Sequence, residues 1–118
     1  MVKTRIAVLI SGNGTNLQAL INAQADGVIK HGRIVLVVSS NSIAHGLKRA
    51  EAAGIETAVV TKKQCGSEEA FEQKLIEVLK EHNIELIVLA GFMVAVPRQV
   101  CEAYAGRIIN VHPALIPS

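Results

Sequence analysis

Two polar side chains near the end of the sequence could act together on one reacting group. Asn110 and His112 stand at alternate positions of a short apolar segment, so in a β-strand both side chains point to the same side. An imidazole with a pKa near neutrality can donate a proton, and a carboxamide can stabilise a developing oxyanion without changing charge. Pro113 favours an extended backbone at His112. The pair suits acyl-type transfer, and a histidine satisfied by local hydrogen bonds at a strand end is the alternative.

A glycine-rich stretch near the start could bind an anion. Residues 11–16 read SGNGTN and lie between an apolar run and a helical pattern, where backbone N–H groups meet the positive end of a helix. Leu17 replaces the third glycine of a dinucleotide fingerprint, residues 39–41 supply no ribose-binding carboxylate, and no lysine follows Gly14 as in a Walker A loop. The stretch therefore predicts a phosphomonoester site. A tight turn with Thr15 as helix N-cap is the alternative.

The remaining histidines and both cysteines receive no role from their surroundings. His31, His45 and His82 fall on expected helix ends or loops, which predicts solvated surface groups. Cys65 and Cys101 form neither a zinc-binding spacing nor a disulfide framework. The helical spacing of Cys101 within an apolar segment predicts a buried structural thiol.

Short runs rich in Val and Ile alternate with stretches of helical period, which is the pattern of βαβ units in an α/β protein. The expected strands are residues 5–11, 33–40, 55–60, 84–90 and 107–111. The expected helices start near residue 15, cover 45–53, run from a cap at Ser67 to about residue 81, and lie between Pro97 and Gly106. Right-handed crossovers then give a Rossmann-like, doubly wound, mainly parallel sheet in which residues 84–90 form a central strand buried on both faces.

Ligands of such sheets bind outside the carboxyl ends of the strands. The loops at residues 11–16, 91–96 and 110–118 should therefore line one crevice. These are also the segments that carry the glycine stretch and the Asn110/His112 pair. We expect function at this pole of the sheet.

Composition limits the partners. The 118 residues are 50% hydrophobic with a formal charge of +2, and only 3% are aromatic, which predicts one folded domain and no nucleic acid partner. The apolar runs are too short for a membrane span, and the first residues do not form a signal peptide. We expect a cytoplasmic protein.

Three motifs in this order resemble the phosphoribosylglycinamide formyltransferase family. They span the chain and read AVLISGNGTNL at residues 7–17, LAGFM at residues 89–93 and INVHPALIP at residues 109–117. The resemblance implies transfer of a formyl group from 10-formyltetrahydrofolate to the amine of glycinamide ribonucleotide, in purine biosynthesis. The formyl-folate would be a co-substrate, with no metal, and a homodimer is compatible with the resemblance although the sequence does not define the oligomeric state.

The resemblance also implies roles for individual residues. The substrate phosphate would be held by Gly14, Thr15 and Asn16. The folate would be bound by Met93, Val94, Ala95, Val96 and Asn110. Asn110 would also stabilise the tetrahedral intermediate, and His112 would be the general acid.

The sequence departs from the family pattern at a few positions. Ala114 and Val94 replace residues common in the family, and Glu68 lies near the place of a basic residue that meets the folate's glutamate tail, for which Lys62 or Lys63 could compensate. The chain ends at Ser118, before the family's catalytic Asp. We therefore expect residues 1–118 to form a single N-terminal formyltransferase domain, truncated after the Asn-x-His-Pro motif, weakly active or inactive alone, and with residues 107–111 as an open sheet edge.

Three alternatives are weighed against this function. Related folate-dependent formyltransferases and hydrolases share the Asn-x-His core, but hydrolases carry a second His where Pro113 stands, and methionyl-tRNA formyltransferases have a different first loop. A catalytically incomplete fragment that only binds phosphate is the second alternative. A nucleotide-dependent oxidoreductase is the third, and Leu17 disfavours it.

Overall fold

The computed structural model describes residues 4–27 and 30–111, which form five strands and five helices. The strands are β1 (Thr4–Ile10), β2 (Gly32–Ser39), β3 (Glu56–Val59), β4 (Leu86–Ala90) and β5 (Ile108–Val111). The helices are α1 (Thr15–Ala25), α2 (Gly46–Ala52), α3 (Lys62–Cys65), α4 (Glu68–Glu81) and α5 (Arg98–Ala103). None of these helices combines the length and the apolar character needed to cross a bilayer.

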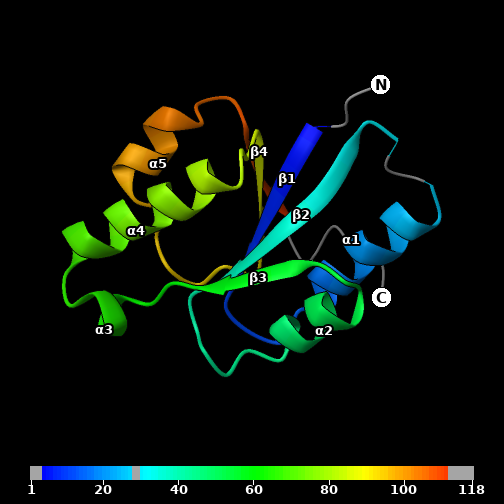
Figure 1. Cartoon of the computed structure of the whole chain (residues 1–118), viewed down its shortest axis with the longest axis horizontal. Helices are drawn as coiled ribbons and strands as arrows, with labels where there is room; N and C mark the ends of the chain where they lie inside the picture. Colours follow the sequence, from blue (N-terminus) through cyan, green and yellow to red (C-terminus); the bar gives the residue numbers. More distant parts are fainter. Residues whose placement is uncertain (1–3, 28–29, 112–118) are drawn as a thin grey trace.

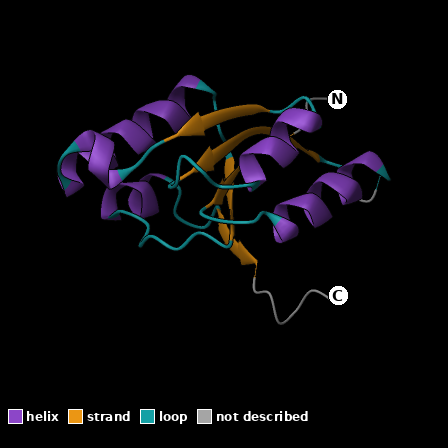
Figure 2. Cartoon of the chain, turned by 90° about the horizontal axis from the view of Figure 1, so that it is seen from below, coloured by secondary structure: helices purple, strands orange, loops and turns teal. Residues whose placement is uncertain are grey.

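The strands form one sheet in the order β3-β2-β1-β4-β5, and every pairing in it is parallel. Helices cover both faces of the sheet, with α1 and α2 on one side and α4 and α5 on the other (Figure 1, Figure 2). The order reverses between β1 and β4, since the chain builds outward from β1 to β3 and then returns to β4 and β5. The predicted doubly wound, Rossmann-like fold is confirmed.

Two apolar clusters, one on each face, hold the layers together. Phe71, Leu75 and Leu79 of α4 and Val100 of α5 pack on one face of the sheet. Leu17 of α1 packs on the other. Helix α4 buries residues three or four positions apart, as an amphipathic helix does.

A β-bulge assigns the residues of β2 to these two faces. Ile6 pairs with Ile34 but Ala7 pairs with Leu36, so Val35 is the extra residue. Ile34 consequently joins the cluster under α1, whereas Leu36 joins the cluster under α4. Without the bulge, strand alternation would place both on the same face.

The predicted local signals act where expected. Ser67 caps α4, its side chain accepting a hydrogen bond from the amide of Ala70 at 3.1 Å. Gly54 follows the end of α2 with a φ of 74°. The sequence pattern does not predict helix α3, because a single turn capped by Thr61 carries no hydrophobic period.

Two expectations about the second half of the sheet have different outcomes. Strand β4 is a central parallel strand as predicted, since it lies between β1 and β5, but its burial on both faces is incomplete because Leu86 and Leu89 are only half-buried. Strand β5 pairs only with β4, so among the described residues its outer edge is open, as predicted.

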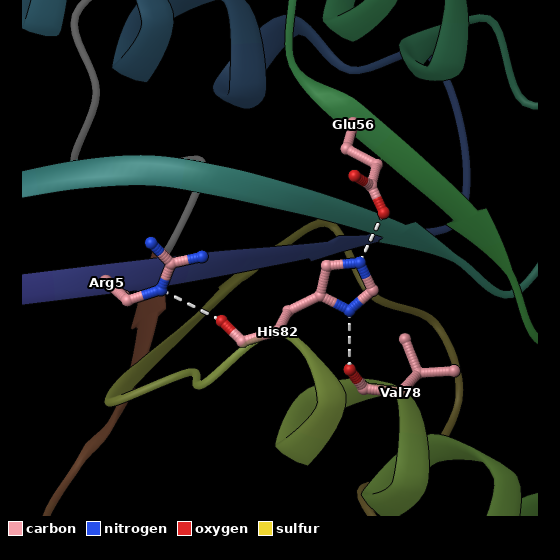
Figure 3. Close-up of polar contacts among 4 residues, drawn as sticks. All are labelled: Arg5, Glu56, Val78 and His82. Carbon is pink, nitrogen blue, oxygen red and sulfur yellow. Dashed lines mark hydrogen bonds and ion pairs between the residues drawn. The ribbon is translucent and has the colours of Figure 1, made fainter.

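The prediction that His82 is a solvated surface group is wrong. Its Nε2 pairs with the carboxylate of Glu56, and its Nδ1 lies 2.8 Å from the carbonyl oxygen of Val78 in the last turn of α4 (Figure 3). The hydrogen bond to Glu56 raises the pKa of His82 above its ordinary value, with a further contribution from the Val78 carbonyl. The His82 carbonyl accepts a hydrogen bond from Nε of Arg5 at 2.9 Å. These contacts join α4, β3 and β1 at the amino end of the sheet.

Candidate functional site

The carboxyl ends of β1 and β4 meet at the point where the strand order reverses. The β1 loop runs from Ser11 into α1, which covers one face of the sheet. The β4 loop runs from Gly91 into α5, which covers the other face. The two loops therefore separate at this point, and the crevice between such loops is the usual ligand position in open parallel sheets.

Ser11 links the first of these loops to two others. Its side chain is almost fully buried, with 8% exposed. The hydroxyl accepts a hydrogen bond from the Met93 amide at 2.8 Å and lies 2.5 Å from the hydroxyl of Ser40, which follows β2. The loops after β1, β2 and β4 are consequently tied together at one side chain.

The glycine stretch turns sharply at Gly14. This residue precedes α1 with a φ of 79° and makes no side-chain cap. A Cβ atom there would lie 2.6 Å from the Cα of Gly46, so only glycine allows this close approach of α2. Thr15 is the first residue of the helix, and the alternative in which it serves as N-cap is wrong because Gly14 occupies that position.

The amides that follow this turn have no protein acceptor within the described ranges. The N–H groups of residues 13–17 donate to no backbone or side-chain oxygen there, and the first helical hydrogen bond is made by Gln18 to the Gly14 carbonyl at 2.8 Å. Thr15 is exposed and Asn16 is half-buried. Unpaired amides at a helix N-terminus can donate hydrogen bonds to phosphate oxygens.

The loop after β4, which Ser11 ties to the start of the glycine stretch, exposes one large apolar side chain. Met93 is 84% exposed, although its amide is fixed by Ser11. Val94 and Val96 pack against the core under α4 and α5, whereas Ala95 is exposed. In the described part of the chain the amides of residues 94–96 have no acceptor, so both apolar and backbone polar groups are available to a ligand here.

Asn110 lies on the same face of the sheet as that loop. It pairs in register with Leu89, which packs against the cluster under α4. Ile108, two positions earlier and therefore on the same face of the strand, packs against the same cluster. The side chain of Asn110 is exposed at the end of β5. His112, and with it the predicted Asn110/His112 geometry, lies outside the described residues.

A groove of about 320 Å³ extends from the β4 loop along α4. Ala95 and Val96 line one side, and Lys62, Glu68 and Phe71 line the other. The groove includes two of the predicted folate-binding residues but none of the glycine stretch. Lys62, one of the two lysines that could compensate for Glu68, pairs with Glu68 itself at 3.4 Å.

Two further outcomes concern residues around the site. Cys101 is exposed, so the prediction of a buried thiol is wrong. The buried residues of this segment are Val100 in α5 and Tyr104 in the turn that follows it. Arg49, which the sequence did not single out, donates from Nε to the Asn13 carbonyl at 2.9 Å. This contact joins α2 to the glycine stretch across 36 positions, and no spacing rule detects such a tertiary contact.

The fold and the site define a doubly wound α/β protein with a glycine turn at its topological switch point and no dinucleotide fingerprint. Residues 4–118 match the family described as formyl transferase, and the chain belongs to that family.

Several known proteins are similar to this chain in sequence or in fold. The chain is 47% identical over 116 residues to the trifunctional purine biosynthetic protein adenosine-3 of Gallus gallus, covering 98% of this chain and 12% of that protein. It is 43% identical over 112 residues to the phosphoribosylglycinamide formyltransferase of Escherichia coli, covering 95% of this chain and 52% of that enzyme. A crystal structure of glycinamide ribonucleotide transformylase 1 from Symbiobacterium toebii superposes with a TM-score of 0.88 at 40% identity, covering 98% of this chain and 54% of that one. The chain thus spans about half the length of these single-function relatives.

Proposed function

We propose that this chain carries the substrate-binding loops and the Asn-x-His motif of a phosphoribosylglycinamide formyltransferase. The reaction would transfer the formyl group of 10-formyltetrahydrofolate to the amine of glycinamide ribonucleotide, in purine biosynthesis. The observation that supports this proposal best is the hydrogen bond from the Met93 amide to Ser11. It joins the glycine turn, whose amides can bind an anion, to the apolar loop after β4 at the switch point of the sheet. The names of the relatives point to the same reaction.

The proposed roles follow the chemistry of each segment. Gly14, Thr15 and Asn16 bind the phosphate of the ribonucleotide through the amides at the start of α1. Residues 93–96, with Asn110, bind the formyl-folate through apolar contacts and unpaired backbone groups. Each substrate is thereby held on its own side of the switch point, with its reacting end toward the strand ends.

Chemistry takes place between the two bound groups. The amine nitrogen attacks the formyl carbon, a C–N bond forms, and the carbonyl oxygen becomes an oxyanion that the Asn110 carboxamide stabilises by donating a hydrogen bond. Collapse breaks the bond to N10 of the folate, and His112 as general acid donates a proton to the departing nitrogen. The attacking nitrogen loses one proton, which returns to the imidazole of His112 and restores the general acid, so charge and atoms balance.

The catalytic roles are tested by His112→Ala and Asn110→Ala in the natural protein at its full length. We expect each change to lower kcat by about 10²- to 10⁴-fold, the range typical of a lost general acid or oxyanion donor. His31→Ala removes an exposed histidine just before β2 and serves as the matched control. Full activity of His112→Ala would exclude the proposed mechanism.

Phosphate binding is tested separately by Thr15→Asp and Asn16→Asp. A negative charge at the start of α1 should abolish ribonucleotide binding in calorimetry, because it repels the phosphate. Asn22→Asp adds the same charge on the same helix about 9 Å further along and should bind normally. Binding without turnover would favour the alternative of a binding-only fragment.

The same proposal extends to the setting of the reaction. Residues 1–118 form a single N-terminal formyltransferase domain, the reaction takes place in the cytoplasm, and it requires neither a metal nor nucleic acid. A homodimer is the assembly to test by sedimentation.

A further inference from the structure

Helix α2 holds the glycine stretch at two successive carbonyl groups. The amide of Gly46, at the start of α2, donates to the Gly12 carbonyl at 3.1 Å. One turn later Arg49 donates from Nε to the Asn13 carbonyl at 2.9 Å. The aliphatic part of Arg49 lies against the same turn, since its Cδ would be 3.2 Å from a Cβ atom at Gly14.

These two contacts determine which way the next amides point. In a trans peptide group the C=O and N–H bonds point in opposite directions. With the carbonyls of Gly12 and Asn13 directed at α2, the amides of Asn13 and Gly14 are directed away from it. They are the first two of the five amides, residues 13–17, that have no acceptor in the described part of the chain.

Arg49 also places a full positive charge beside the turn. Its second hydrogen bond, from Nη1 to Oε1 of Gln18 at 3.4 Å, goes to a neutral amide. Within the described ranges no carboxylate forms an ion pair with it, whereas Arg98 is paired with Glu102 at 2.9 Å. The first turn of α1 holds no acidic residue. The charge of Arg49 is therefore available to an anion bound at this turn.

We propose that Arg49 is a positioning residue for the substrate phosphate. It acts through the Asn13 carbonyl, which it holds so that the following amide faces the ligand, and it adds positive potential behind the amides. This inference rests on the phosphate site of the proposed function. It assigns to α2, which itself carries none of the predicted site residues, the task of shaping that site.

The test compares Arg49→Gln, Arg49→Lys and a matched control. Arg49→Gln removes the charge and the Nε donor, whereas Arg49→Lys keeps the charge but lacks the rigid guanidinium that reaches both Asn13 and Gln18. Arg98→Gln removes the same charge from α5. The probes are ribose 5-phosphate and ribose, titrated against the amide signals of residues 13–17.

We expect Arg49→Gln to weaken ribose 5-phosphate binding by about tenfold and Arg49→Lys by about threefold, with Arg98→Gln within about twofold of the unchanged protein. Ribose binding should not respond to any of them. In the full-length natural enzyme, Arg49→Gln should raise KM for the ribonucleotide by about tenfold and leave kcat within about threefold.

The outcomes separate this inference from the proposed function. Tight ribose 5-phosphate binding by both Arg49 variants would overturn the role of Arg49 and leave the phosphate site intact. An equal loss in kcat and in ribose binding would show a general structural role and would also overturn it. If the unchanged protein did not bind ribose 5-phosphate, the phosphate site itself would fail, and this inference with it.

Discussion

Two independent constraints exclude a side chain at Gly14. Its φ of 79° is one that residues with a side chain rarely adopt, and a Cβ would come within 2.6 Å of the Gly46 backbone. Backbone cannot move aside as a flexible side chain can. The turn that presents the amides of residues 13–17 thus depends on the absence of a side chain at Gly14.

Gly14→Ala should therefore destabilise the protein by about 2–4 kcal/mol, from left-handed strain and overpacking together. Gly12→Ala is the matched control, since Gly12 has no positive φ and a Cβ there meets nothing within 4 Å. We expect it to change stability by less than about 0.5 kcal/mol. Urea unfolding measures both, and equal effects would contradict the close packing of α2 on the turn.

Replacing Ser11 should destabilise the protein more than replacing Ser40, its hydrogen-bond partner. Ser11→Ala leaves the Met93 amide without its acceptor, which costs about 1–2 kcal/mol for a partly buried group. Ser40→Ala removes only the contact between the two hydroxyls and should cost less than about 1 kcal/mol. Amide exchange at Met93 should accelerate in Ser11→Ala alone, and unchanged exchange there would rule out the link between the two loops.

Among the elements, the C-terminal end of α4 is held by a contact that depends on pH. His82 closes the helix and pairs with Glu56 at the start of β3. A protonated imidazole at a helix C-terminus also interacts favourably with the helix dipole. Because these contacts hold the pKa of His82 above 6.5, the folded protein retains the proton more strongly than the unfolded chain.

The stabilisation is therefore complete below the ordinary pKa of 6.5 and is lost as the pH rises through the higher pKa of the folded state. The Glu56 side chain is 63% exposed and that of His82 21%, so solvent screens the pair from one side and we expect a contribution of at most about 1 kcal/mol. Glu56→Gln should lower the free energy of unfolding at pH 6 and have little effect at pH 9. The control is Glu68→Gln, because the carboxylate of Glu68 pairs with Lys62 and with no histidine. It should change the free energy of unfolding equally at pH 6 and at pH 9. A pH-independent loss in Glu56→Gln would exclude the protonation mechanism.

Elements that bury an apolar face could be predicted from the sequence. Helix α4 follows from Ser67 and the spacing of Phe71, Leu75 and Leu79, because capping and period are local properties. The bulge at Val35 could not be predicted, since it depends on how β1 and β2 pair. The exposure of Cys101 was missed for a related reason: helical period does not say which face the sheet covers.

The candidate site likewise has one part that the sequence predicts and another part that it does not. Glycine spacing and position after a strand predict the turn at Gly14, because a positive φ has a residue preference. The contacts of Arg49 with Asn13 and of Ser11 with Met93 join segments 36 and 82 positions apart. No pattern along the chain contains that information, and only the packing of α2 and the strand order reveals it.

At the scale of the molecule, the two ends of the sheet hold different kinds of polar group. At the amino end Arg5, Glu56, His82 and Glu85 are paired with one another or with backbone. At the carboxyl end the amides of residues 13–17 and 94–96 have no acceptor within the described ranges. Paired groups stabilise the fold, whereas unpaired groups on exposed residues such as Asn13 and Thr15 can exchange water for a ligand. Changes at the amino end should therefore alter stability with little effect on binding.

The strand order also predicts how stability is distributed over the sheet. Strand β1 pairs on both sides, and residues 7–10 are completely buried, whereas β5 pairs only with β4 and leaves Ile109 51% exposed. Amides of β1 should exchange with solvent only through global unfolding, and those of β5 through local opening at least about 100-fold faster. Strand β3, which pairs only with β2, is the matched control and should exchange as fast as β5. If β5 were protected as strongly as β1 while β3 exchanged quickly, the outer edge of β5 would be paired in solution, and its description as an open edge would be wrong.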